Sequence, residues 1–235
     1  MNDAAGDARR PGVGFALTAL GAVAILLALG TWQVDRLNWK RGLIAERQAM
    51  ASQPTLNVTD RAAVAEFQPV SLTGTLAHGA EMLVGPRMRN GRPGWRVITP
   101  LALAGGGAVL VDRGWVSVAR KTPAQRARGQ VAGVVTIVGM ARFPGPRGAF
   151  TPDNEPEKGQ WFRVSPGEMA AARKLDQVAG WWLAAGAAPN PGGWPKGGEA
   201  LAPLPDNHLY YAITWYALAL AASVIAIMLW VRGRR

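Results

Sequence analysis

Cysteine is absent from this 235-residue chain, and only two histidines are present. Without thiols the chain cannot form disulfides, attach haem covalently through paired cysteines or build a thiolate copper site. A hydrolase triad needs a histidine beside a nucleophile and a carboxylate, which leaves His78 and His208 as candidates for its base. The acidic residues are scattered in loops, and Gly105-Gly106-Gly107 lacks the Lys-Ser/Thr of a phosphate-binding loop. The sequence therefore specifies no catalytic centre.

Two long apolar stretches set the broad class of the protein. Uncharged residues run from Pro11 to Val34 and again from Leu209 to Val231. Each stretch reaches the roughly 20 apolar residues that cross a bilayer core as a helix, and buried helices of soluble proteins are usually shorter. Aromatic residues mark the ends of both stretches, as in the belts of membrane proteins: Trp32, Tyr210, Tyr211, Trp215, Tyr216 and Trp230. We therefore expect transmembrane helices at residues 13–34 and 208–231.

The first stretch has a second interpretation, as a cleaved signal peptide. Arg9 and Arg10 precede it, and Ala22-Val23-Ala24 resembles a cleavage site. That triplet lies in the middle of a stretch longer than a signal-peptide core, which favours an uncleaved anchor. Two spans place tails 1–12 and 232–235 on one side of the membrane. Arginines after the second span favour cytoplasmic tails and a large domain outside.

The net charge of +11 does not indicate nucleic-acid binding. Five basic and two acidic residues lie in the tails, so the region between the spans carries about +8. Such a charge favours anionic lipid headgroups or an acidic partner, and solubility alone explains it equally well.

The region between the spans has the pattern of a juxtamembrane helix at 35–53 followed by a β-rich domain at 54–205. Alternating or β-branched runs predict strands at residues 67–76, 81–85, 95–103, 108–116, 131–141, 161–164 and 180–185. The third and fourth runs flank a glycine-rich turn and predict a hairpin. Ser165-Pro166-Gly167-Glu168 predicts a capped helix to about Lys174, and 186–205 predicts a Gly/Pro-rich linker.

The expected fold class is a membrane α hairpin with an inserted β-rich domain. Several short strands in sequence predict a small antiparallel barrel or sandwich, here with a short helix added.

His208 is the candidate binding residue, because it stands where an aqueous domain meets lipid at the start of the second span. Histidine ligates iron, copper and zinc, and an apolar metal-bearing cofactor such as haem suits that boundary. Residues at the spacing of one helical face on each span could surround it: Trp32, Arg36, Trp39 and Lys40 on the first, and Tyr211 (or Ala212) and Trp215 on the second. A macrocycle between these faces would place its carboxylates near Arg36 or Lys40. The alternative is an interfacial histidine in an ordinary aromatic belt with snorkelling cations.

Four distinctive stretches occur in order along nearly the whole chain. They are Leu29–Lys40, which runs on to Leu43-Ile44, then Gly94–Pro100, Val109–Val116, and Asn207–Ala212 with Thr214–Tyr216. Together they resemble the Surfeit locus protein 1 family of cytochrome c oxidase assembly factors. Ser117 departs from the proline that often follows the third stretch, and the residues before the second span carry no family signal.

The resemblance implies two transmembrane helices that flank a domain in the bacterial periplasm or the mitochondrial intermembrane space. Together with the charge pattern it predicts a bacterial inner-membrane protein with its large domain in the periplasm and both termini in the cytoplasm. It implies a non-enzymatic chaperone that binds haem a and assists its insertion into oxidase subunit I. The family's histidine at the start of the second span matches His208, which makes this residue the implied iron ligand. Implied partners are subunit I and membrane lipid, with haem a synthase as a further candidate.

Two other functions stay open from the sequence. One is a membrane scaffold that stabilises a subunit I assembly intermediate without carrying haem. The other is a membrane-anchored sensor or hydrolase, which the missing catalytic cluster and the short tails disfavour.

Overall fold

The computed structural model describes residues 12–61, 63–198, 200–201, 204 and 206–234. It divides into two compact units, one made of Met1–Glu46 with Leu204–Arg235 and the other of Arg47–Pro203. The basic tail residues Arg9, Arg10 and Arg235, on which the predicted topology partly depends, lie outside the described residues.

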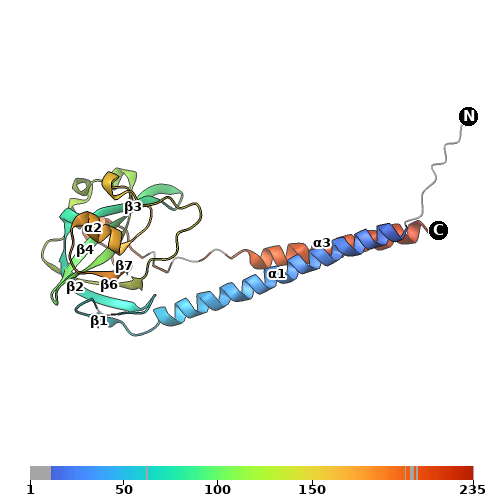
Figure 1. The fold of residues 1–235 in the computed structure, drawn as a ribbon, viewed down its shortest axis with the longest axis horizontal. Coiled ribbons are helices and arrows are strands. Elements are labelled where there is room, and N and C mark those ends of the chain that lie inside the picture. The colour runs from blue at the N-terminus through green and yellow to red at the C-terminus, as the bar shows by residue number, and fades with distance from the viewer. Residues whose placement is uncertain (1–11, 62, 199, 202–203, 205, 235) are drawn as a thin grey trace, which may run out of the picture. The chain divides into compact units, whose positions relative to one another are not determined.

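Two helices, α1 (Val13–Ala51) and α3 (His208–Arg232), run side by side and antiparallel (Figure 1). At 1.5 Å per residue α3 is about 37 Å long, which is enough to cross a hydrocarbon core of about 30 Å. In the most apolar part of each helix only 6% (α1) and 11% (α3) of the residues are buried, so neither helix is packed like the core helix of a soluble domain. The two helices fit a membrane protein with two spans.

The predicted segments 13–34 and 35–53 form one uninterrupted helix, α1. No proline interrupts it, and Gly42 within it is exposed and touches nothing. It ends where the Ser52 hydroxyl donates back to the carbonyl of Gln48 at 2.8 Å, two residues before Pro54. About 58 Å of continuous helix therefore extends well beyond the apolar stretch.

Small residues let α1 and α3 approach closely. Gly30 of α1 is buried against α3, and a Cβ atom there would lie 2.6 Å from Cε1 of the Tyr216 ring. The Tyr216 hydroxyl is 3.2 Å from Oγ1 of Thr31. On α3 the buried residues are Ala212 and Ala219. This use of glycine and alanine at the contact is typical of helix pairs in membranes.

The second unit is a closed five-stranded barrel with two added strands, which confirms the predicted β-rich domain. The strand order is β1-β2-β6-β7-β5-β4-β3, and pairing of β2 with β4 closes the barrel. The strands are β1 (Leu56–Val58), β2 (Pro69–Leu76), β3 (Met82–Arg89), β4 (Arg92–Leu103), β5 (Ala108–Ser117), β6 (Val134–Arg142) and β7 (Val178–Ala185). The short helices are α2 (Pro166–Arg173), η1 (His78–Ala80), η2 (Val118–Arg120), η3 (Pro123–Gly129), η4 (Pro156–Lys158) and η5 (Pro191–Gly193).

Most strand pairs are antiparallel, including the predicted hairpin of β4 and β5 around its glycine-rich turn. β5 and β7 are parallel neighbours, as are β1 and β2, so the barrel is not antiparallel throughout. The β5–β7 pair is parallel because β6 and α2 lie between these strands in the chain.

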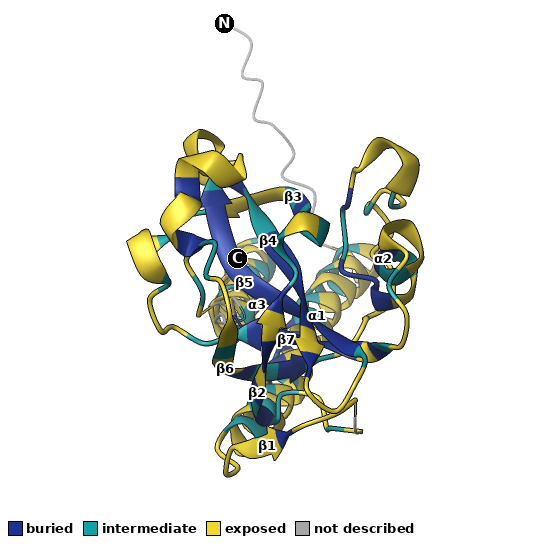
Figure 2. Ribbon diagram, turned by 90° about the vertical axis from the view of Figure 1, so that its left-hand side faces the viewer, coloured by how far each residue is buried: buried dark blue, intermediate teal, exposed yellow. Residues whose placement is uncertain are grey.

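Alternate residues of β5 pack into two different apolar clusters. Val109 and Val111 join the barrel interior, whereas Leu110 packs with Trp182, Trp161 and residues of α2 on the outer face. Both faces of this strand are therefore covered, and Figure 2 shows β4 and β5 as largely buried. A strand covered on both sides needs mostly apolar residues, and β5 has them apart from Asp112 and Arg113.

Two local expectations within 161–168 are wrong. The segment 161–164 is not a strand, because Trp161 makes a single bridge with Val84 before the chain turns into α2. Ser165 precedes α2 as predicted, but its side chain makes no capping hydrogen bond. Glu168 forms an ion pair with Arg163 and accepts from Nδ2 of Asn154 at 2.7 Å, so tertiary partners replace the predicted capping box.

The segment 186–198 is packed onto the barrel and is no simple linker. The N–H of Gly186 donates to the Val138 carbonyl at 2.9 Å, and that of Gly198 donates to Ala185 at 3.1 Å. Lys196 forms a two-way backbone bridge with Trp115. The glycines and prolines of this segment let its backbone lie close to the backbone of the barrel strands. Residues 199, 202–203 and 205 of the predicted linker lie outside the described residues.

Candidate functional site

His208 is the first residue of α3 and contacts α1 through its side chain. Its ring Nδ1 lies 2.8 Å from Oε1 of Gln33. Its backbone N–H donates to the Asp206 carboxylate at 3.2 Å, and this negative charge stabilises the start of the helix. The ring is half-buried, and within the described part of the chain Nε2 has no hydrogen-bond partner. One ring nitrogen is therefore held by the protein and the other is available.

Of the residues predicted around His208 on α3, Trp215 lies on the same helical face and is half-buried. Ala212, between them, is buried with 2% exposure. Tyr211 is turned to the flank of the helix, 48% exposed, and packs edge-on against Tyr210.

The predicted aromatic residues of α1 lie on a different face from the one that meets His208. Trp32 and Trp39 are 56% and 54% exposed, and the Arg36 guanidinium lies 3.9 Å from the Trp39 ring centroid. At about 100° per residue, Trp32 and Trp39 are about 100–120° around the helix from Gln33. Lys40, two turns beyond Gln33, is half-buried on the same side as that residue.

Gln33 and His208 are in direct contact between the two helices at this level. The structure brings His208 and Trp215 to one face of α3. It places Trp32, Arg36 and Trp39 together as a cation–aromatic patch on the outer side of α1.

Gln33 is the site residue that sequence reasoning missed. It is 9% exposed and shares the buried face of α1 with Gly30 and Leu37, three residues before it and four after. This alternation of three and four residues is the spacing of a helix-pairing seam. The available signal was therefore a polar side chain on the seam of an otherwise apolar helix.

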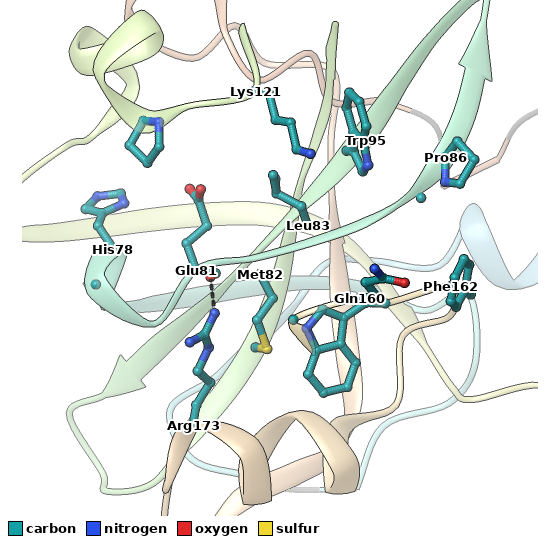
Figure 3. Close-up of a pocket in the computed structure, with 15 residues that line it drawn as sticks. His78, Glu81, Met82, Leu83, Pro86, Trp95, Lys121, Gln160, Phe162 and Arg173 are labelled. Carbon is teal, nitrogen blue, oxygen red and sulfur yellow. Dashed lines mark hydrogen bonds between the residues drawn. The ribbon is translucent and has the colours of Figure 1, made fainter. Parts of the chain in front are cut away.

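The barrel unit has a cleft of about 830 Å³ beside β3, which contains the other histidine (Figure 3). The ring Nε2 of His78 is 2.9 Å from the Val131 carbonyl, and its Nδ1 is buried without a partner among the described residues. Lys121 lies over the Trp95 ring, with its Nζ 4.4 Å from the centroid. His78 follows β2 in the short helix η1.

Glu81 is the one carboxylate among the described residues lining this cleft, and Arg126 neutralises it. Both carboxylate oxygens accept from the Arg126 guanidinium, one at 2.8 Å. Arg173 donates to the backbone carbonyl of Glu81 at 3.0 Å (Figure 3). This carboxylate is committed to an ion pair and is not placed to orient a histidine for acid–base catalysis.

The charged residues of two family-like stretches have structural partners inside the barrel unit. Arg96 on β4 donates through Nε to Asp112 on β5 at 2.6 Å, and Asp112 accepts the Gly114 N–H at 3.0 Å. Arg113 is 2% exposed and donates to the carbonyls of Gly129 and the Asn190 side chain. Burial lowers the pKa of Arg113 to about 10, against the opposing charge of Glu81, so it stays protonated at neutral pH.

Burial also lowers the pKa of Arg87 and of Arg142. For Arg87 the charge of Arg96 adds to this effect, and for Arg142 the hydrogen bond that its guanidinium donates to Glu66 opposes it. These arginines pack against the barrel as cations, and none contacts a described histidine.

In the sequence two apolar helices flank a small barrel, and a histidine is held at the start of the second helix. This arrangement fits a two-span membrane protein with an inserted β domain. Residues 20–220 match the model of the SURF1 family, and the chain belongs to that family. The resemblance noted from the sequence is thereby confirmed. The family is known for cytochrome c oxidase assembly factors and is not a known enzyme family.

Three relatives align with most of this chain. A SURF1-like protein of Monosiga brevicollis is 37% identical over 97% of this chain and 90% of its own length. The human Surfeit locus protein 1 is 31% identical over 87% of this chain and 74% of its own, and the Mus musculus protein is 32% identical over 89% and 73%.

Proposed function

We propose that the protein binds haem a and assists its insertion into subunit I of a haem–copper cytochrome c oxidase. Membership of a family of oxidase assembly factors supports the assembly role. The observation that carries the haem part is the donor set at His208: one imidazole, held through Nδ1, with Nε2 available at the end of an apolar helix pair.

A single available imidazole fits haem better than a bare metal ion. Structural and catalytic sites for zinc and similar ions take three or four protein ligands. Among the described residues no group of three or more His, Cys, Asp or Glu side chains could hold such an ion. Haem carries its own four equatorial nitrogens, so the protein need supply only an axial ligand. His208 fits that role, and when bound the haem would contribute the redox iron destined for the oxidase.

The surrounding residues offer the other chemistry that haem requires. Trp215 would flank the macrocycle, because it shares the face of His208. Lys40, which is half-buried on the same side of α1 as Gln33, would meet a haem carboxylate. Tyr211 is exposed aromatic surface on the helix of His208 that would extend the apolar contact.

We place the protein in a bacterial inner membrane, with the barrel unit in the periplasm and both termini in the cytoplasm. The basic residues that follow the first span would then meet anionic headgroups. The proposed partners are oxidase subunit I, membrane lipid and haem a synthase, and the proposed role is that of a carrier without catalytic activity.

The test is the absorption spectrum of the full chain purified from cells that make haem a. We expect a haem a spectrum in the wild type, its loss in His208→Ala, and its retention in the matched control His78→Ala. An unchanged spectrum in His208→Ala would remove this residue as the ligand. A colourless wild type that still co-purifies subunit I would support the scaffold function instead.

A further inference from the structure

We infer that Gln33 is a positioning residue that selects the tautomer of His208 and so presents Nε2 as the ligand nitrogen. The contact between Gln33 and His208 is observed in the helix pair itself. Its effect on a bound iron rests on the proposed haem function. Gln33 belongs to α1 and His208 to α3, and both lie in the same compact unit.

The chemistry of the contact fixes the direction of the hydrogen bond. In this amide orientation Oε1 of Gln33 faces Nδ1 of His208 at 2.8 Å, and because a glutamine Oε1 is only an acceptor, Nδ1 carries the proton and donates it. A neutral imidazole has one N–H, so Nε2 then carries the lone pair. Without Gln33 the ring could exchange between both tautomers and rotate about its side-chain bonds.

The position of Gln33 is consistent with a dedicated role. Its side chain is buried with 9% exposure on the seam of α1, between Gly30 and Leu37. A polar group in such a contact is costly unless it has a partner, and His208 supplies one. A second side-chain hydrogen bond between the helices, which joins the hydroxyls of Thr31 and Tyr216, is longer at 3.2 Å and involves no ring nitrogen.

Metal-bound histidines usually donate their second N–H to a carbonyl or carboxylate, which fixes the ring and raises its basicity. The Gln33 amide oxygen occupies that place for His208. Its loss typically weakens metal affinity by about 10–100-fold. A less basic imidazole also stabilises ferric iron less, which raises the reduction potential of the bound haem.

The first measurement needs no haem. The chain has only two histidines, so ¹⁵N-histidine NMR of the full chain in detergent resolves His208 once His78→Ala assigns the other ring. For the neutral ring in alkaline buffer we expect the Nδ1–H tautomer of His208. Gln33→Leu should give a mixture of tautomers, and Gln33→Glu, which keeps an acceptor, should preserve the single form. Thr31→Val is the matched control, because it removes the other interhelical bond.

The second measurement loads the same proteins with haem a. We expect Gln33→Leu to lose affinity by about 10–100-fold and to raise the reduction potential, with Thr31→Val unchanged and Gln33→Glu lowering the potential. An Nε2–H tautomer in the wild type, or a single unchanged tautomer in Gln33→Leu, would overturn the inference. So would haem properties in Gln33→Leu equal to those of the wild type. If the tautomer results hold and the wild type binds no haem a, the proposed function fails and the positioning role toward iron falls with it.

Discussion

Replacing Glu81 with leucine should destabilise the barrel unit strongly, because it leaves the Arg126 cation buried without its counter-charge. The Arg126 side chain is fully buried and that of Glu81 is 7% exposed. Breaking a buried pair from one side costs about 3–5 kcal/mol. Arg113 adds to the cost, since Glu81 also favours its charged form. For a chain of this size the loss corresponds to a fall in Tm of about 6–20 °C.

Thermal unfolding of the full chain in detergent, followed by tryptophan fluorescence, measures this effect. The double variant Glu81→Leu with Arg126→Met should lose much less than the sum of the two single variants, because no lone charge remains. The control is Asp153→Asn, which breaks an exposed pair with Arg147 and should cost under about 1 kcal/mol. Additive losses in the double variant, or equal shifts for Glu81→Leu and Asp153→Asn, would refute the buried-pair reasoning.

Two further predictions concern glycines that have matched controls. Gly30→Ala should weaken the helix pair by about 1–3 kcal/mol, because its Cβ would lie 2.6 Å from a tyrosine ring, whereas Gly21→Ala on the same helix meets no atom within 4 Å. Thermal unfolding in detergent checks both, and equal melting temperatures would contradict the close helix contact. Gly114→Ala should cost about 1–3 kcal/mol or more, because φ is +117° and a Cβ would meet a backbone carbonyl at 2.2 Å. Gly180→Ala, a strand position with open space, should change stability by less than about 0.5 kcal/mol, and a similar loss at both sites would argue against the close approach at Gly114.

The helices and most strands could be predicted because their signals are local. An apolar run of bilayer length predicts a span, and the glycine-rich turn at 104–107 predicts the β4–β5 hairpin. The parallel pairing of β5 with β7 could not be predicted, because it joins strands about 70 residues apart through register rather than composition.

The errors near α2 have a common physical cause. The mostly apolar residues 161–164 resemble a strand, but Trp161 and Val164 fill the outer cluster around Trp182, and the segment makes only one bridge. Glu168 stands where a capping box would need it, yet Arg163 offers a charged partner that a local motif cannot reveal. Local patterns compete with tertiary contacts that the sequence does not display.

One of the two residues in contact at the candidate site was predicted from the sequence. His208 could be chosen because of its position at the membrane boundary, but its partner Gln33 depends on how two helices 175 positions apart are rotated against each other. Aromatic residues at helical spacing look alike whether they meet the other helix or lipid. Trp215 lies on the same face of α3 as His208, whereas Trp32 and Trp39 lie on a different face of α1 from Gln33, which contacts His208.

The most direct test of haem binding at this site is rescue of His208→Gly by free imidazole, measured as haem a bound per chain. The wild type should retain haem a, the glycine variant should lose it, and added imidazole should restore it, because the variant leaves a space for the missing ligand. Haem a bound equally by the wild type and by His208→Gly without imidazole would contradict His208 as the ligand. A wild type that stays free of haem a in cells that make it would contradict the carrier function itself.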